Sequence, residues 1–128
     1  MRLAFASAMA EGYDYYLWLN DDTVLLPGAI ADLLNHHKTL VSQGQSNAIV
    51  VGSTKDPNTG MPTYGGAVRS QKWYSNNLEF LPSGSELKEC EAMYGNCVLI
   101  PKAVADVAGN FVCRFSLFFG DLVFGLRA

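Results

Sequence analysis

Apolar residues occur in short blocks along the chain, and polar residues, glycine or proline separate these blocks. In residues 2–11 alanine, leucine and methionine predominate, and Leu3, Ala6 and Ala10 fall on one side of a helical projection. Gly12 follows as a stop signal. This pattern predicts a helix over residues 2–11.

An almost wholly apolar run, Tyr-Tyr-Leu-Trp-Leu, occupies residues 15–19 and ends abruptly in four polar residues. Such a run is typical of a strand that is covered on both faces. Pro27 suits a first helical turn, where its missing N–H has no cost. Residues 29–40 then place apolar side chains at helical spacing, and this predicts a second helix with one face formed by Ile30, Leu33, Leu34, His37 and Leu40.

The middle of the chain predicts strands and turns. Residues 48–52, Ala-Ile-Val-Val-Gly, read as another buried strand. The Asp-Pro-Asn-Thr-Gly sequence at 56–60 is a dense turn signal, and it predicts a hairpin or a long loop leading into residues 61–69. Residues 73–91 have no clean period, and we interpret them as loop with short strands.

Towards the end of the chain, residues 97–100 predict a strand, and Pro101 opens a short helix that runs through Val107 and closes at Gly109-Asn110. The last residues, 118–128, resemble the start of another helix. Alternation of helix and strand predicts an α/β fold. A length of 128 residues with 49% hydrophobic and 16% charged content fits one domain over residues 1–128.

The charge pattern excludes some classes of partner. A formal net charge of −3 without clustered Lys or Arg offers no field for a phosphate backbone, so nucleic acid is not an expected partner. No apolar run reaches the roughly 20 residues that a membrane span needs. We expect a cytoplasmic protein, and peripheral association with the inner membrane face stays open.

The three cysteines, Cys90, Cys97 and Cys113, form an odd set without a CxxC pair, and reduced thiols are the simplest interpretation. His36 and His37 have no partner at metal-ligand spacing, so a solvated or packed helix face is expected there. Trp73, Tyr74 and Tyr64 are candidates for sugar stacking, although loop aromatics more often pack under their own loop.

Asn20, Asp21 and Asp22 lie where the predicted strand 15–19 ends. In open α/β sheets ligands bind beyond the carboxyl ends of the strands. Two adjacent carboxylates repel each other unless a cation offsets their charge. Hard oxygen ligands suit Mg²⁺ or Mn²⁺. The alternative is a solvated turn in which both aspartates are only turn formers.

Residues 18–25, Trp-Leu-Asn-Asp-Asp-Thr-Val-Leu, resemble the DxD-type region of family 2 glycosyltransferases with the GT-A fold, particularly rhamnosyltransferase-like members. The resemblance implies that Asn20 faces the nucleotide sugar and that Asp22 binds the divalent cation, Mn²⁺ or Mg²⁺, which bridges the diphosphate. Asp21 is a secondary substrate-binding residue. Asn20 stands where the family usually has aspartate, so the metal assignment depends on Asp22.

Residues 94–101, Tyr-Gly-Asn-Cys-Val-Leu-Ile-Pro, are similar to the segment that opens the acceptor pocket in the same family. The resemblance makes Gly95 and Asn96 substrate-binding residues. A glycine-led turn into a core strand is the alternative.

Residues 119–127 resemble the family's C-terminal acidic motif. The resemblance makes Asp121 the general base that takes a proton from the acceptor hydroxyl, with Gly120 beside it in the substrate site. Helix capping explains a carboxylate there equally well. Val123 stands where the family often has a second acidic residue.

The resemblance implies a GT-A-like mixed sheet flanked by helices, of which this chain holds the central and acceptor-side part without the N-terminal nucleotide-binding half. It implies an inverting, metal-dependent transfer from a nucleoside-diphosphate sugar to a glycan or lipid-linked acceptor. We expect either a piece of a longer gene product or a chain that pairs its sheet edge with another copy. The alternatives are a non-catalytic binding or interaction module, favoured by Asn20 and Val123, and a nucleotidyltransferase, for which a Gly-rich phosphate loop is lacking.

Overall fold

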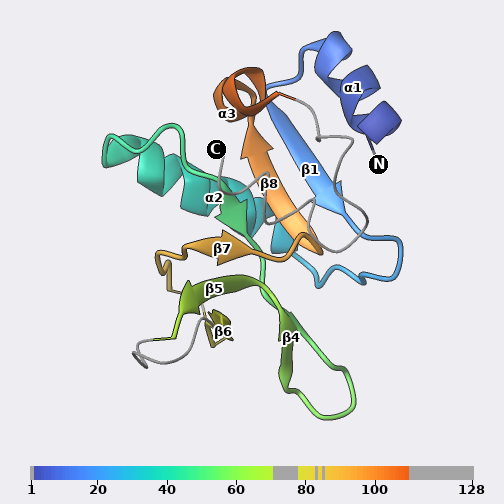
Figure 1. Cartoon of the computed structure of the whole chain (residues 1–128), viewed down its shortest axis with the longest axis vertical. Coiled ribbons are helices and arrows are strands. Elements are labelled where there is room, and N and C mark those ends of the chain that lie inside the picture. The colour runs from blue at the N-terminus through green and yellow to red at the C-terminus, as the bar shows by residue number, and fades with distance from the viewer. Residues whose placement is uncertain (1, 71–77, 83, 85, 110–128) are drawn as a thin grey trace.

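The computed structural model describes residues 2–70, 78–82, 84 and 86–109, and it combines helices with short antiparallel strands (Figure 1). The largest packed unit is a sheet of three strands, β1 (Tyr15–Leu19), β8 (Cys97–Pro101) and β2 (Val50–Val51). β8 lies in the middle and pairs antiparallel with both neighbours. The helix predicted to start in residues 118–128 lies outside the described part of the chain.

One face of this sheet packs against two helices, α1 (Arg2–Glu11) and α3 (Lys102–Ala108). Because side chains alternate along a strand, every second residue of β1 and β8 points to this face. These residues are Tyr16, Trp18, Val98 and Ile100, and all four are buried. Burial of a side chain the size of Ile100 contributes about 1.5–3 kcal/mol.

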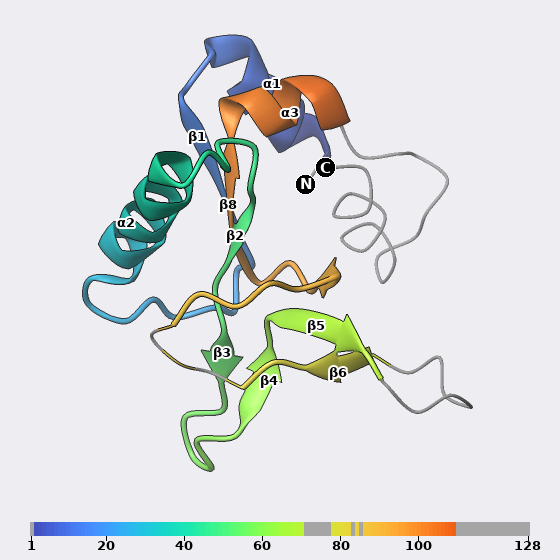
Figure 2. The same cartoon turned by 90° about the vertical axis from the view of Figure 1, so that its left-hand side faces the viewer.

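The other face packs against α2 (Ala29–Ser42), which lies across the sheet from α1 and α3 (Figure 2). Leu33 of α2 packs in a second buried cluster with strand residues that point to this face. These residues are Val50 of β2 and Cys97 and Leu99 of β8. β1 and β8 therefore carry apolar residues at almost every position because helices cover both of their faces. This confirms the strand predicted over residues 15–19, but its two faces differ. Tyr16 and Trp18 are buried, whereas Tyr15 and Leu17 are half-buried on the α2 side and Leu19 is exposed.

Two smaller sheets lie beyond the carboxyl end of β2 (Figure 1). One is the hairpin of β3 (Thr54–Lys55) and β4 (Pro62–Tyr64), whose loop is the predicted turn at 56–60. The other places β5 (Gly66–Arg69) between β6 (Leu78–Phe80) and β7 (Ala92–Met93). Of the two outcomes expected for residues 56–69, the structure adopts the hairpin.

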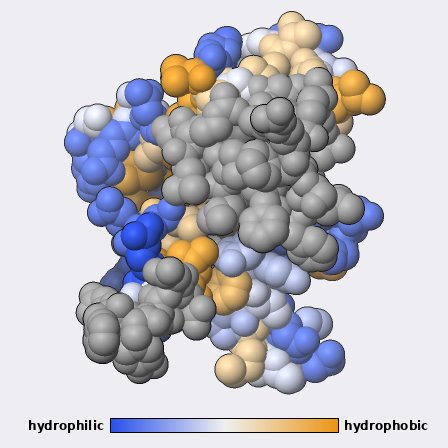
Figure 3. All heavy atoms as spheres, viewed as in Figure 1, coloured by the Kyte–Doolittle hydropathy of each residue, from blue (hydrophilic) through white to orange (hydrophobic). Residues whose placement is uncertain are grey.

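The helix predictions that fall on described residues are confirmed, but the predicted packing face of the first helix is wrong. Leu3 is 84% exposed, and Phe5 instead packs its ring edge-on against Tyr16 at 5.6 Å between ring centroids. Figure 3 shows apolar residues facing outwards over α1 at the upper right, whereas hydrophilic residues gather over α2 at the left. α1 ends at Glu11, and Gly12 follows with a positive φ of 73°.

The predicted mixture of helices and strands is confirmed, and every strand pair in the described residues is antiparallel. The strand predicted over 48–52 is shorter and covers only Val50–Val51. The helix predicted to open at Pro101 begins at Lys102, with Pro101 as its N-cap. Of the helices described, none combines the length and the apolar character that a bilayer crossing requires.

Candidate functional site

The acidic segment forms a tight turn directly after β1. The backbone N–H of Thr23 donates to the carbonyl oxygen of Asn20 at 3.2 Å, so residues 20–23 close a four-residue turn. Asp21 and Asp22 occupy the two central positions and are exposed. The turn therefore presents two adjacent carboxylates to solvent.

Asn96, the residue before β8, anchors this turn. The β1–β8 ladder continues one residue beyond β1, because the Asn20 N–H donates to the Asn96 carbonyl oxygen at 3.2 Å. The Thr23 hydroxyl donates to the same carbonyl oxygen at 3.4 Å. The side-chain amides also meet, with Asn20 Nδ2 donating to Asn96 Oδ1 at 3.2 Å. Three hydrogen bonds from Asn20 and Thr23 to Asn96 thus hold the acidic turn at a fixed place on the sheet.

The backbone of Asn96 is itself held by the second small sheet. Asn96 N–H donates to the Tyr94 carbonyl oxygen at 2.9 Å, and Tyr94 N–H donates to the Gly65 carbonyl oxygen at 3.1 Å. Gly95, between them, is buried. These contacts connect the acidic turn to the β1–β8–β2 sheet and to the β6–β5–β7 sheet.

The antiparallel pairing explains why these segments meet. Leu19, the last residue of β1, pairs with Cys97, the first residue of β8. The carboxyl end of β1 and the amino end of β8 therefore lie at the same sheet edge. Of the predicted site residues, the structure brings Asn20, Asp21, Asp22, Gly95 and Asn96 together at this edge. Gly120 and Asp121 lie outside the described residues.

The donor set at the turn fits a hard divalent cation. Mg²⁺ commonly takes one or two protein carboxylates and completes its shell with water and substrate phosphates. Asp21 and Asp22 provide such carboxylates in an exposed position. Within the described residues no three His, Cys, Asp or Glu side chains gather as a metal-binding group. A cation held by Asp22 would thus draw its remaining ligands from water and a diphosphate.

The histidine pair lies on α2, and His37 belongs to the packed core. Its Nδ1 lies 3.1 Å from the Tyr15 hydroxyl, and its Nε2 lies 3.2 Å from the Ser46 carbonyl oxygen. Only Nε2–H can donate to a carbonyl, so Nδ1 accepts from Tyr15. This network confirms the expectation of a packed helix face.

Cys90 and Cys97 carry free thiols, and burial raises the pKa of both. A raised pKa keeps the thiol protonated and therefore a poor nucleophile. Cys113 lies outside the described residues. Trp73 and Tyr74 also lie outside them, whereas Tyr64 of β4 is exposed.

Sequence reasoning missed two features of this region. One is the contact from Thr23 to Asn96, although threonine in a turn is a common backbone-bonding residue. The other is the contact between the rings of Phe80 and Tyr94, whose centroids lie 5.0 Å apart. No local pattern signals the ring contact, because it depends on which strands pair.

Comparison with known proteins found no counterpart for this chain. No protein-family model matches it, and no curated protein or solved structure matches it either.

Proposed function

We propose that the chain is part of a metal-dependent transferase that moves a sugar from a nucleoside-diphosphate sugar to an acceptor hydroxyl. The observation that carries the proposal is the contact between Asn20 and Asn96 at 3.2 Å. It joins the two segments that resemble the donor and acceptor parts of family 2 glycosyltransferases. A GT-A-type sheet and a cytoplasmic location, free or at the inner membrane face, are parts of the same proposal.

The proposed roles follow from the chemistry of each group. Asp22 holds a divalent cation, Mn²⁺ or Mg²⁺, with Asp21 beside it, and Asn20 contacts the sugar nucleotide. When bound, the cation supplies positive charge that stabilises the departing diphosphate. Gly95 and Asn96 contact the acceptor, and Asp121, with Gly120 next to it, takes the proton from the attacking hydroxyl. Attack from the face opposite the diphosphate inverts the anomeric centre.

A second candidate is a binding module of similar fold that holds a sugar nucleotide without turnover. The observation that favours it is the position of Asn20, whose amide bonds Asn96 where the family usually has a carboxylate. This candidate predicts nucleotide binding with no sugar transfer.

Calorimetry tests the metal assignment. We expect Mn²⁺ with uridine, guanosine or thymidine diphosphate to give binding heat that disappears in Asp22→Ala. The matched control is Asp14→Ala, which removes the same charge from an exposed position at the opposite end of β1. Equal heats in the wild type and Asp22→Ala would remove Asp22 as a ligand.

Sugar-transfer assays separate the two candidates. We expect Asp121→Asn to abolish turnover while the Asp22-dependent nucleotide heat persists, because the amide cannot accept the proton. Full turnover in Asp121→Asn contradicts the role of Asp121 as base. Nucleotide heat in the wild type with no transfer to any acceptor favours the binding module.

A further inference from the structure

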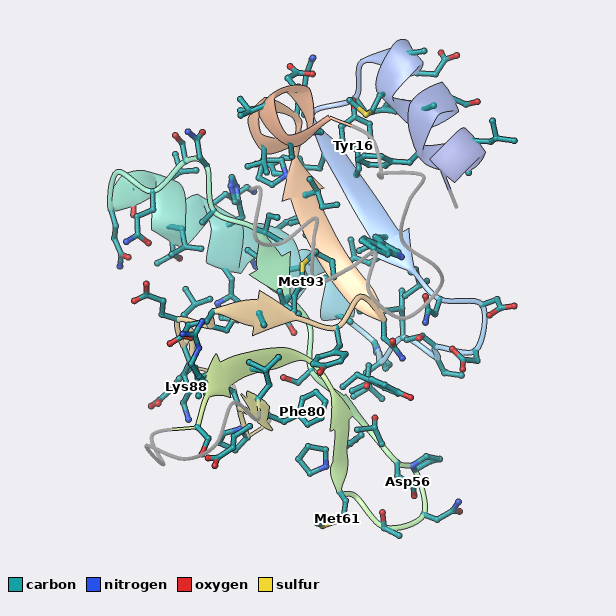
Figure 4. The ribbon with its side chains drawn as sticks, viewed as in Figure 1. Tyr16, Asp56, Met61, Phe80, Lys88 and Met93 are labelled. Carbon is teal, nitrogen blue, oxygen red and sulfur yellow. The ribbon has the colours of Figure 1, made fainter. Side chains whose placement is uncertain are left out.

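Two aromatic rings, those of Phe80 and Tyr94, meet two residues before Asn96, the anchor of the acidic turn, and we call them the aromatic pair. Their centroids are 5.0 Å apart and their planes are tilted by 51°. Phe80 is 44% exposed and Tyr94 is half-buried. In Figure 4 the Phe80 ring reaches out from β6, well away from Met61 near the tip of the β3–β4 hairpin.

The sheet register explains how the two rings come into contact. Ala67 pairs with Phe80 on one side and with Ala92 on the other, so these three side chains share one face of the sheet. Tyr94 lies two residues beyond Ala92, which continues the same face. Between the rings, β5 contributes nothing larger than a methyl group, so the rings reach each other across it.

The charged side chains of this sheet already have polar partners. Arg69 pairs with Glu91 at 3.8 Å, and Glu79 Oε1 accepts from the Ser70 hydroxyl at 2.7 Å. Arg69 and Glu79 are the charged residues of the described strands β5, β6 and β7. Since the one cation of these described strands is paired and Glu79 keeps its negative charge, this surface fits an uncharged ligand better than a phosphate.

The amide pair of Asn20 and Asn96 has hydrogen-bonding capacity left over. Asn20 Nδ2 donates to Asn96 Oδ1, and this uses one donor and one acceptor. Within the described residues, Asn96 Nδ2 and Asn20 Oδ1 have no partner. The pair thus offers one free donor group and one free acceptor, which together match a hydroxyl group.

The aromatic pair and the amide pair are neighbours along the backbone. Only Gly95 separates Tyr94 from Asn96, and the backbone folds back so that Asn96 N–H meets the Tyr94 carbonyl oxygen at 2.9 Å. One short, tightly folded segment therefore carries both an apolar ring and a polar amide. A pyranose ring has the same division, because its C–H faces are apolar and its rim carries hydroxyl groups.

We infer that the aromatic pair and the amide pair form a subsite for a neutral pyranose of the acceptor. The rings of Phe80 and Tyr94 contact the C–H face. Asn96 Nδ2 donates to a rim hydroxyl, and this hydroxyl donates to Asn20 Oδ1, so Asn20 lies between the sugar nucleotide and the acceptor. That this pyranose belongs to the acceptor rests on the proposed function, whereas the recognition of a neutral sugar does not. Small-molecule sites usually combine aromatic side chains with a small number of polar groups, and this subsite has the same composition.

The tilt of the rings argues against a nucleobase as the occupant. A flat base stacks face to face on one ring, and a second ring inclined by 51° cannot stack on the same base. A chair-shaped pyranose is thick and presents axial C–H groups in different directions. It can therefore touch both inclined rings.

Titration of the full chain with cellobiose, maltose and methyl α-L-rhamnopyranoside, followed by amide NMR shifts, tests the subsite. We expect at least one sugar to shift the Gly95 and Asn96 amides. Phe80→Ala should raise its Kd about tenfold, and Phe80→Tyr should keep it within about twofold, because the stacking surface remains. The control Met61→Ala, at a side chain 66% exposed on the β3–β4 hairpin, should leave the Kd unchanged.

The outcomes separate this inference from the proposed function. Sugar binding that depends on Phe80 but persists in Asp22→Ala supports the subsite, even where no metal-dependent nucleotide heat exists. Nucleotide heat without binding of any of the three sugars overturns the subsite and leaves the proposed function standing. A Phe80→Ala effect on uridine diphosphate rather than on sugars also overturns it and assigns the rings to a base. Unchanged thermal melting of Phe80→Ala excludes unfolding as the cause of lost binding.

Discussion

The side-chain amides of Asn20 and Asn96, which lie 76 residues apart in the chain, are joined by a hydrogen bond of 3.2 Å from Asn20 Nδ2 to Asn96 Oδ1. This bond lies at the sheet edge where the carboxyl end of β1 meets the amino end of β8. It couples the position of the acidic turn to the position of the Tyr94–Gly95–Asn96 segment. A ligand that displaces one of these segments therefore has to break or move this bond.

The first prediction concerns this coupling. Asn20→Ala and Asn96→Ala should each lower the free energy of unfolding by about 0.5–1.5 kcal/mol, because each removes a partly buried hydrogen bond. In the double variant the losses should not add, and the coupling energy should be about 1 kcal/mol. Urea denaturation of the four proteins measures it. Strict additivity would mean that the bond contributes nothing to stability.

The second prediction concerns the contact between Tyr15 and His37. Tyr15→Phe should lower the free energy of unfolding by about 1–3 kcal/mol, because the buried Nδ1 of His37 loses its donor. The matched control is Tyr13→Phe, which removes the same hydroxyl from a side chain 59% exposed and should change little. Thermal melting compares the two variants. Equal melting temperatures for them would count against the hydrogen bond.

The third prediction concerns the close approach of β5 to Cys90. A Cβ added at Gly66 would lie 2.9 Å from both Cβ and Sγ of Cys90, which is closer than van der Waals contact allows. Gly66→Ala should therefore destabilise the protein by about 1–3 kcal/mol. Gly84→Ala serves as the control, since its added Cβ would meet nothing closer than 4.0 Å. A stable, normally melting Gly66→Ala protein would refute the packing at this position.

The fourth prediction concerns pH and the loop of the β3–β4 hairpin. The backbone N–H groups of Thr59 and Asn58 donate to Asp56 Oδ1, both at 2.8 Å, and they lower the pKa of this carboxyl. A group whose pKa is lowered by folding stabilises the folded state above its unfolded pKa. That stabilisation is lost as pH falls through the folded pKa. The contribution of Asp56 to the stability of this loop should thus be lost in acid.

An NMR titration of the Asp56 carboxyl measures this effect directly. Asp56→Asn should remove the acid-induced step in the amide shifts of residues 58–59, because the amide does not titrate. Thr59→Ala should keep most of the lowered pKa, since the backbone N–H of residue 59 is its largest cause and survives the substitution. A titration of Asp56 at its ordinary pKa would contradict the turn geometry.

The sequence by itself determined the elements whose signals are local. Helical spacing marked α1 and α2, with Gly12 after the first and Pro27 before the second. Dense apolar runs marked β1 and β8, because propensity and periodicity act over a few neighbouring residues. The turn at 56–60 was equally local, since Asp56 caps its own loop. The sequence alone also indicated residues 18–25 and 94–101 as candidate site segments, through their resemblance to a known family. The roles assigned to Asp22 and Asp121 stay predictions.

Tertiary structure alone decided which faces and segments meet. Phe5 rather than Leu3 packs against the sheet, because α1 must lie against Tyr16 and α3, and no helical projection contains that partner. The contacts of Asn20 with Asn96 and of Phe80 with Tyr94 depend on strand register, which is set by pairing between residues distant in the chain. Local pattern specifies that a strand forms, and only long-range packing specifies its neighbour.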